Sequence, residues 1–80
     1  MINDPQFSDD ILIKIGQRFR QLRLEKGYTN YEQFAFEHDL PRAQYGRYEK
    51  GADMRMSSFL RVLQAFDISV KDFFAEGFDD

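Results

Sequence analysis

The sequence of 80 residues contains no cysteine and no tryptophan, and it has only one histidine and two prolines. Without cysteine, the chain can form neither a disulfide nor a thiolate metal site, and it has no cysteine nucleophile. One histidine, His38, is too few for a histidine-rich metal site or a conventional catalytic triad. We expect His38 to be a half-buried residue at a helix end, and we expect no metal and no cofactor.

Long apolar runs are also missing. None approaches the roughly 18–20 residues that a helix needs to span a bilayer, and residues 1–5 lack the basic start and apolar centre of a signal peptide. A soluble cytoplasmic protein is therefore expected. The sequence shows no phosphate-cradling glycine loop, no paired-carboxylate signature and no histidine-centred constellation, so it predicts a protein that is not an enzyme and has no small-molecule substrate.

Aromatic residues are abundant by contrast. Nine phenylalanines and four tyrosines give 16% aromatic residues within a hydrophobic fraction of 42%. A chain of this length forms one domain and buries about 60–65% of its unfolded surface. We therefore expect one small core with phenylalanine as its main packing unit.

The charge is distributed unevenly along the chain. The net charge of −3 at first argues against a nucleic-acid partner. Residues 11–66, however, hold ten of the eleven basic residues and only six of the fourteen acids, so the middle of the chain carries +4 and the ends are acidic. A basic centre suits a DNA-facing surface, although on charge alone ordinary solvation of a small domain explains the pattern equally well.

The apolar spacing predicts helices and no strand of useful length. The first helix is expected over residues 10–26 and ends at Gly27. The second begins after Asn30, whose side chain can cap it in a capping-box pattern with Gln33, and it ends near His38. We expect Asp39 to adopt the left-handed conformation that stops this helix.

Three more helices are predicted at residues 41–50, 57–66 and 70–75. Pro41 fits the first turn of the third helix. The fourth is the most apolar and should be central to the core, with Asp67 as another left-handed stop, and Ser69 can cap the fifth. Met54 and Met56 are expected to fill the edge of the core. The fold class is thus all-α with five helices, residues 1–9 loosely attached, 10–76 as the domain and 77–80 as an acidic tail.

The second and third predicted helices are short and separated by only two to four residues, as in a helix-turn-helix. Several pieces fall in order around them. They are Ile15-Gly16 followed by Phe19, Leu22 and Arg23; Phe34-Ala35; Leu40; Tyr45 to Gly51; Phe59 to Phe66; and Ile68-Ser69-Val70. Residues 15–74 therefore resemble the lambda-repressor-like helix-turn-helix family of the Xre or Cro/C1 type. The chain departs from that family at Tyr31, where glutamine is frequent, and at Asp39 and Asp67, where glycine is frequent.

The resemblance implies which residues bind DNA. In that family the third helix lies in the major groove, with base edges near its N-terminal half. Arginine suits guanine, and glutamine suits adenine. The matching base-contacting residues are Arg42, Ala43, Gln44, Gly46 and Arg47. The matching phosphate-contacting residues are Tyr31, Lys50 and Arg55.

The resemblance also implies structural roles. Arg23 and Glu49 match a pair that ties the first helix to the third. Phe73, Phe74 and Phe78 exceed what a short terminal helix hides, so they are expected to form a homodimer interface; alternatively, Phe73 and Phe74 close the core of the monomer. We interpret the chain as a sequence-specific, double-stranded DNA-binding transcriptional repressor. The alternative is a protein-interaction module, such as an antitoxin-like partner, for which DNA binding is secondary.

Overall fold

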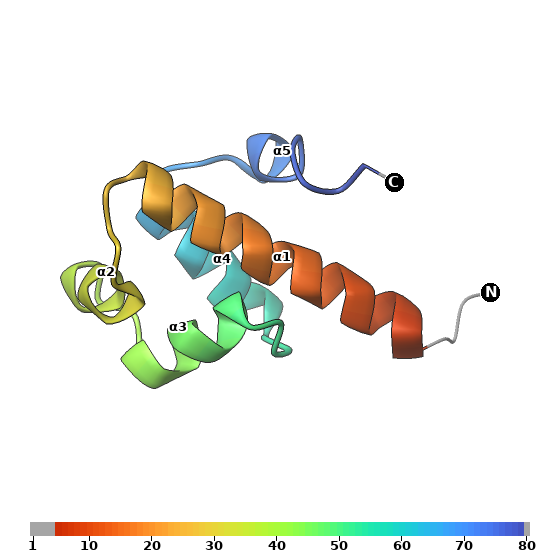
Figure 1. Cartoon of the computed structure of the whole chain (residues 1–80), viewed down its shortest axis with the longest axis horizontal. Helices are drawn as coiled ribbons and strands as arrows, with labels where there is room; N and C mark the ends of the chain where they lie inside the picture. Colours follow the sequence, from red (N-terminus) through yellow and green to blue (C-terminus); the bar gives the residue numbers. More distant parts are fainter. Residues whose placement is uncertain (1–4, 80) are drawn as a thin grey trace.

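A computed structural model describes residues 5–79, which form five helices joined by short connections (Figure 1). No strand occurs within these residues, so the predicted all-α, five-helix architecture is confirmed. The helices are α1 (Pro5–Glu25), α2 (Tyr31–Glu37), α3 (Arg42–Glu49), α4 (Met56–Phe66) and α5 (Val70–Phe73).

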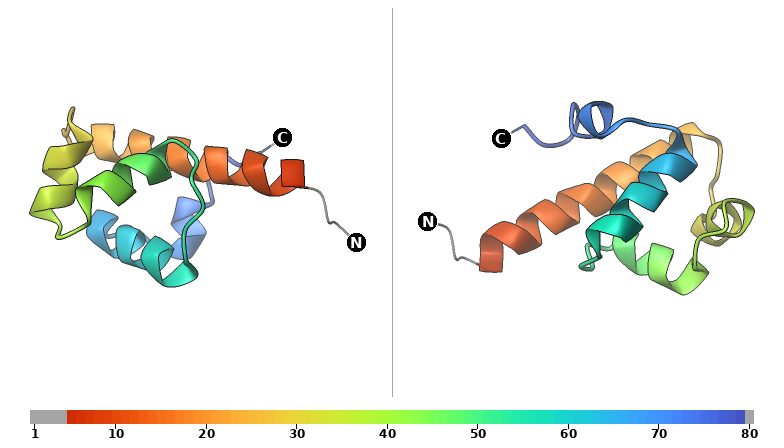
Figure 2. Two further views of the ribbon diagram at one scale, coloured as in Figure 1. Left: turned by 90° about the horizontal axis from the view of Figure 1, so that it is seen from below. Right: turned by 180° about the vertical axis from the view of Figure 1, so that it is seen from behind.

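Helix α1 crosses the whole molecule and organises the other four. Helix α5 lies on one side of it and the α2–α3 pair on the other, while α4 crosses behind it (Figures 1 and 2). The N-terminal turns of α1 extend beyond the remaining helices, and the molecule measures 40 × 24 × 21 Å. Because α1 contacts both α3 and α5, it can fix the position of one of these helices relative to the other.

Helix α1 begins at Pro5, five residues before the predicted start. Of the segment 1–9 that was expected to be loose, residues 5–9 are therefore helical, although exposed, and residues 1–4 lie outside the described part. Proline suits the first turn of a helix because its missing N–H has no partner there anyway. The side chain of Gln6 donates to Asp10 Oδ1 at 2.8 Å, one helical turn further on. These exposed turns show no apolar spacing, which is why the sequence pattern missed them.

The predicted cap of α2 is present. Asn30 Oδ1 accepts hydrogen bonds from the backbone N–H groups of Glu32 at 2.7 Å and Gln33 at 3.2 Å. The capping-box prediction for Gln33 is not seen, because its side-chain amide donates to Glu37 Oε2 at 3.0 Å instead. Asp39 has φ 58°, the left-handed stop expected at the end of this helix.

The end of α4 and the start of α5 follow the same local rules. Asp67 has φ 54°, and Ser69 Oγ accepts from the backbone N–H of Asp72 at 3.0 Å. Helix α4 starts at Met56, one residue earlier than predicted, and α5 ends at Phe73, two residues earlier. The expectation for Met56 was wrong, because its side chain is 68% exposed at the start of α4 instead of filling the core edge.

The core is built around the ring of Phe19 on α1. Its centroid lies 5.4–6.2 Å from four other aromatic rings, which come from α3, α4 and α5. Phe34 of α2 joins this cluster by stacking on Phe66 at 4.6 Å. The buried apolar residues are Phe19, Phe34, Ala35, Leu40, Tyr45, Phe59, Val62, Leu63, Phe66 and Phe73.

Candidate nucleic-acid interface

Helices α2 and α3 form a compact pair whose turn is anchored in the core. Leu40, in the turn, is buried, and its N–H donates to the carbonyl of Ala35 at 2.8 Å. Tyr45 of α3 is fully buried against Phe19 and Phe34. Because its inward side is fixed in this way, α3 presents a defined outward side to solvent.

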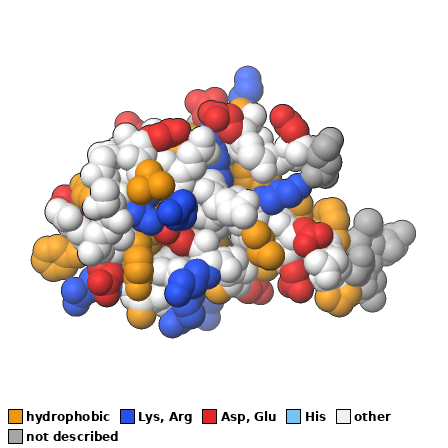
Figure 3. Space-filling model, viewed as in Figure 1, with side chains coloured by type: hydrophobic (Ala, Val, Ile, Leu, Met, Phe, Trp, Pro, Cys, Tyr) orange, Lys and Arg blue, Asp and Glu red, His pale blue; other side chains and the backbone are white. Residues whose placement is uncertain are grey.

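The outward side of α3 carries hydrogen-bond donors. Arg42, Ala43, Gln44 and Arg47, which are four of the five predicted base-contacting residues, are all exposed to solvent. Gln44 and Arg47 line a hollow together with Arg55 and Ser58, which come from the start of α4. Basic side chains gather along the lower edge of the molecule in Figure 3, over the position of α3.

The prediction for Gly46 was wrong, because this residue faces α2 and not the outward surface. Gly46 is buried, and a Cβ atom at this position would lie 2.5 Å from Cε1 of Tyr31. Glycine therefore makes room for the tyrosine ring at the first residue of α2. Tyr31 itself is half-buried, and its hydroxyl would lie 3.0 Å from the same Cβ, so the phenol end lies beside α3.

The predicted phosphate-contacting residues Lys50 and Arg55 stand at helix ends. Lys50 is the C-cap of α3 and Arg55 is the N-cap of α4, and both are exposed. No side chain caps the N-terminus of α4, so its first-turn N–H groups have no side-chain acceptor within the described residues. Such groups favour anions. The loop between α3 and α4 thus combines cationic side chains with backbone donors.

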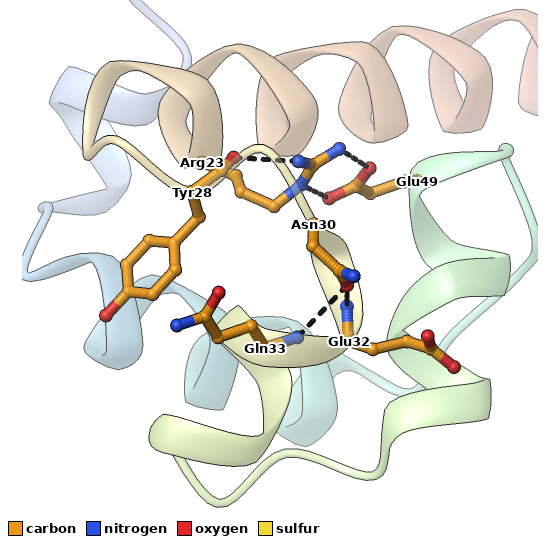
Figure 4. Close-up of polar contacts among 6 residues, drawn as sticks. All are labelled: Arg23, Tyr28, Asn30, Glu32, Gln33 and Glu49. Atoms are coloured by element: carbon orange, nitrogen blue, oxygen red, sulfur yellow. Dashed lines mark hydrogen bonds and ion pairs between the residues drawn. The ribbon is translucent and has the colours of Figure 1, made fainter.

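The structure joins Arg23 and Glu49, the residues that the family resemblance paired. Arg23 Nε donates to Glu49 Oε2 at 2.7 Å and its NH2 donates to Oε1 at 2.9 Å, while NH1 donates to the carbonyl of Tyr28 at 2.9 Å (Figure 4). The two side chains are only 6% and 8% exposed. The hydrogen bond to Glu49 raises the pKa of the Arg23 guanidinium. This two-pronged contact ties the last turn of α1 to the end of α3.

A second contact between α1 and α3 involves backbone. A Cβ atom at Gly16 would lie 2.5 Å from the carbonyl oxygen of Tyr48 and 2.6 Å from that of Glu49. Only glycine allows α1 to approach the end of α3 so closely. Together with the ion pair, Gly16 fixes the depth and the rotation of α3.

Arg18 has a role that the sequence did not reveal. Its side chain is buried at 4% exposure, and it donates from Nε to the carbonyl of Phe73 at 2.8 Å and from NH2 to that of Asp72 at 3.0 Å. These carbonyls belong to the last turn of α5, which therefore receives its hydrogen bonds from α1. In the sequence, Arg18 stands one position from the apolar stripe of its helix. Solvent-exposed arginines are found at the same kind of position, so this signal did not predict its burial.

The predicted aromatic interface divides into two parts. Phe73 is fully buried within the monomer, so its assignment to a dimer surface was wrong; it faces inward because its ring packs on Phe19 and Phe59. Phe74 is 39% exposed and Phe78 is half-buried against both neighbouring rings. Phe74 lines an apolar groove with residues of α1, α4, α5 and the loop before α4. Its other lining residues are Leu12, Ile15, Met54, Met56, Phe59, Leu60 and Val70.

His38 packs its ring on Phe34 at 4.6 Å and is half-buried, as expected. Residues 5–79 contain no group of three or more side chains that could hold a metal ion. None of the helices in this part of the chain is both long and apolar enough to cross a membrane.

This chain is similar to a protein of known structure. No protein-family model matches the chain, and no curated protein matches it. Among solved structures, the high-resolution crystal structure of the restriction-modification controller protein C.AhdI from Aeromonas hydrophila is similar, with a TM-score of 0.70. The two chains are 35% identical, and the match covers 81% of this chain and 98% of the other.

Proposed function

This chain belongs to the family of restriction-modification controller proteins, and we propose that it is a sequence-specific, double-stranded DNA-binding regulator of transcription. The observation that carries the proposal is the outward row of donors on α3, held against the core behind a tight turn from α2. The similarity to a controller protein supports a regulatory role and not an enzymatic one.

In the proposed complex, α3 lies in the major groove, which is about 12 Å wide and admits a helix. Arg42 and Arg47 each offer a fork of donors that matches O6 and N7 of guanine, and Gln44 can pair with adenine in the same two-pronged way. Ala43 is exposed between them and suits contact with a thymine methyl group. These residues supply sequence preference.

Residues at the margins of α3 supply affinity. Lys50 stands at the end of α3, and Arg55 lines the hollow at the start of α4. We propose that both neutralise phosphates beside the groove. Tyr31 offers a hydroxyl at the first turn of α2, beside α3. Phosphate contacts of this kind hold the protein in register without reading sequence.

We infer that the protein is a homodimer through α5 and the start of α4. The apolar groove contains the exposed side chains of Met56, Leu60, Val70 and Phe74, and these lie on two neighbouring helices. A second copy is the occupant that a two-fold axis brings to such a surface, since each copy then covers the other. Two α3 helices related by this axis would read half-sites about 34 Å apart.

The regulated promoter is proposed to belong to a restriction-modification system, the role that the name of the similar protein states. Bound over a promoter, the dimer would act as a repressor by occupying the site that polymerase needs. In vitro transcription from a promoter that contains the bound sequence, with rising protein concentration, tests this. Repression should follow operator occupancy; transcription that rises with occupancy would exclude repression.

The DNA-binding function is tested by selecting bound sequences from a random pool and then measuring affinity at several salt concentrations. Each phosphate contact contributes about 0.9 to the slope of log K against log salt. Lys50→Ala should weaken binding to every sequence and lower the slope by about 1, whereas Arg47→Ala should also relax the sequence preference. If both variants lose affinity equally on all sequences, the division into base and phosphate contacts is wrong. No salt-dependent binding at all would favour a protein-interaction module.

A further inference from the structure

Phe36 is exposed although it is large and apolar. At 69% exposure it is the most exposed large apolar side chain in residues 5–79, and it stands on the last turn of α2. The guanidinium carbon of Arg42, the first residue of α3, lies 5.9 Å from its ring centroid. That distance is within the range of about 6 Å over which a cation is attracted to the face of an aromatic ring.

The turn between the two helices brings these residues together. Asp39 adopts the left-handed conformation at φ 58°, which reverses the chain and brings the start of α3 beside the end of α2. Arg42 forms no ion pair with a carboxylate within the part of the chain that the structure describes, so no acid competes with the ring for its guanidinium. The ring of Phe36 is thus the group that holds the end of this side chain.

A guanidinium held over a ring remains free to bind a base. When a guanidinium stacks on an aromatic ring, the contact uses the face of the planar group, whereas its five N–H donors point outward from the edge. Two-pronged recognition of guanine needs two of those donors in one plane and in one orientation. An arginine already held by its face loses less rotamer freedom when it binds than one that moves freely in solvent.

We propose that Phe36 is a positioning residue for Arg42, and that it sharpens the preference of the protein for the base pair that Arg42 contacts. This inference rests on the proposed DNA-binding function. Phe36 itself touches no base in this scheme; it acts by orienting the arginine.

The test compares Phe36→Leu with Phe36→Tyr, because leucine removes the ring and tyrosine keeps it. The base pair contacted by Arg42 is first identified as the operator position at which Arg42→Ala relaxes preference in a selection from random DNA. Kd is then measured on the selected operator and on an operator changed at that position. Phe7→Leu serves as the matched control, because Phe7 is also exposed, at 53%, but stands on the N-terminal turns of α1.

Phe36→Leu should weaken binding to the selected operator two- to fivefold, which corresponds to the 0.5–1 kcal/mol of an exposed cation–π contact. It should lose a similar factor of discrimination at the identified position, whereas Phe36→Tyr and Phe7→Leu should keep both. In the Arg42→Ala background, Phe36→Leu should have no further effect.

Unchanged discrimination in Phe36→Leu, or an equal loss in the Arg42→Ala background, would overturn the positioning role while leaving DNA binding intact. A wild-type protein that binds no DNA would overturn the proposed function, and the inference with it. Thermal unfolding of each variant separates a loss of binding from a loss of fold.

Discussion

Replacing Glu49 by alanine should destabilise the protein strongly, even though glutamate is a residue type that is usually exposed to solvent. The carboxylate accepts two hydrogen bonds from Arg23, and both side chains are less than a tenth exposed. After the substitution, the guanidinium keeps its bond to the Tyr28 carbonyl but is otherwise left without a partner. Removing one member of a buried pair therefore costs more than the pair itself contributes.

The magnitude follows from the position of the pair. Loss of one partner of a fully buried ion pair costs about 3–5 kcal/mol, and the lower end applies here because the Arg23 guanidinium keeps its hydrogen bond to the Tyr28 carbonyl. A domain of 80 residues has a total stability of about 4–12 kcal/mol. A loss of about 3 kcal/mol would thus lower Tm by roughly 12–24 °C.

Urea unfolding followed by circular dichroism measures this loss. The double variant Arg23→Met, Glu49→Leu should recover much of it, because no unpaired charge remains. Glu32→Ala is the matched control, since Glu32 is an exposed acid on α2 whose change should stay within about 0.5 kcal/mol. A Glu49→Ala variant within 1 kcal/mol of the wild type, or a double variant less stable than the single one, would refute the reasoning.

Three further outcomes are expected. Gly16→Ala should lower the free energy of unfolding, measured in urea, by about 1–2 kcal/mol. The reason is that displacing the backbone at Tyr48 costs more than the roughly 1 kcal/mol that alanine gains in a helix. A more stable variant would show that α1 and α3 are not in close contact at this point. The Tyr28 hydroxyl donates a hydrogen bond to Glu37 Oε1 at 2.7 Å, and this bond lowers the pKa of Glu37. The stability that the bond contributes to the fold is therefore present at neutral pH and is lost as the pH falls through that lowered pKa. Tyr28→Phe should therefore raise the pKa of Glu37 in an NMR titration, and an unchanged value would show that the bond does not form in solution. Leu60→Glu places a charge in the apolar groove. In sedimentation at micromolar concentration this variant should be monomeric and the wild type dimeric; a monomeric wild type would contradict the proposed dimer.

Features that depend on a few neighbouring residues were predictable from the sequence. Asn30 and Ser69 cap helices because their side chains reach N–H groups only two or three residues away, and Asp39 and Asp67 end helices because they tolerate positive φ. The exposed residues Arg42, Gln44 and Arg47 of α3 came from the family resemblance and not from a local rule. The pairing of Arg23 with Glu49 came only from family resemblance, because no local rule joins residues 26 positions apart.

Features that depend on contacts between helices were not predictable in the same way. Phe73 and Phe74 are adjacent and chemically identical, and the rotation of a helix of four residues decides which one is buried. That rotation is set by rings and an arginine from other helices. Gly46 likewise shows no preferred side in the sequence, because the group that requires it is the ring of Tyr31 on α2.

Helix α1 connects the two surfaces that the proposed function needs. Near the C-terminal end of α1, Arg23 holds the end of α3. Gly16, seven residues earlier on the same helix, sets the depth of α3, and between them Arg18 holds the last turn of α5. All three positions fall within eight residues of one straight helix, about 11 Å of its length. In the proposed dimer, the separation of the two α3 helices is therefore set by contacts of α1. A substitution in these contacts should alter the spacing of half-sites that the dimer accepts, while a substitution on the outward side of α3 should alter only their sequence.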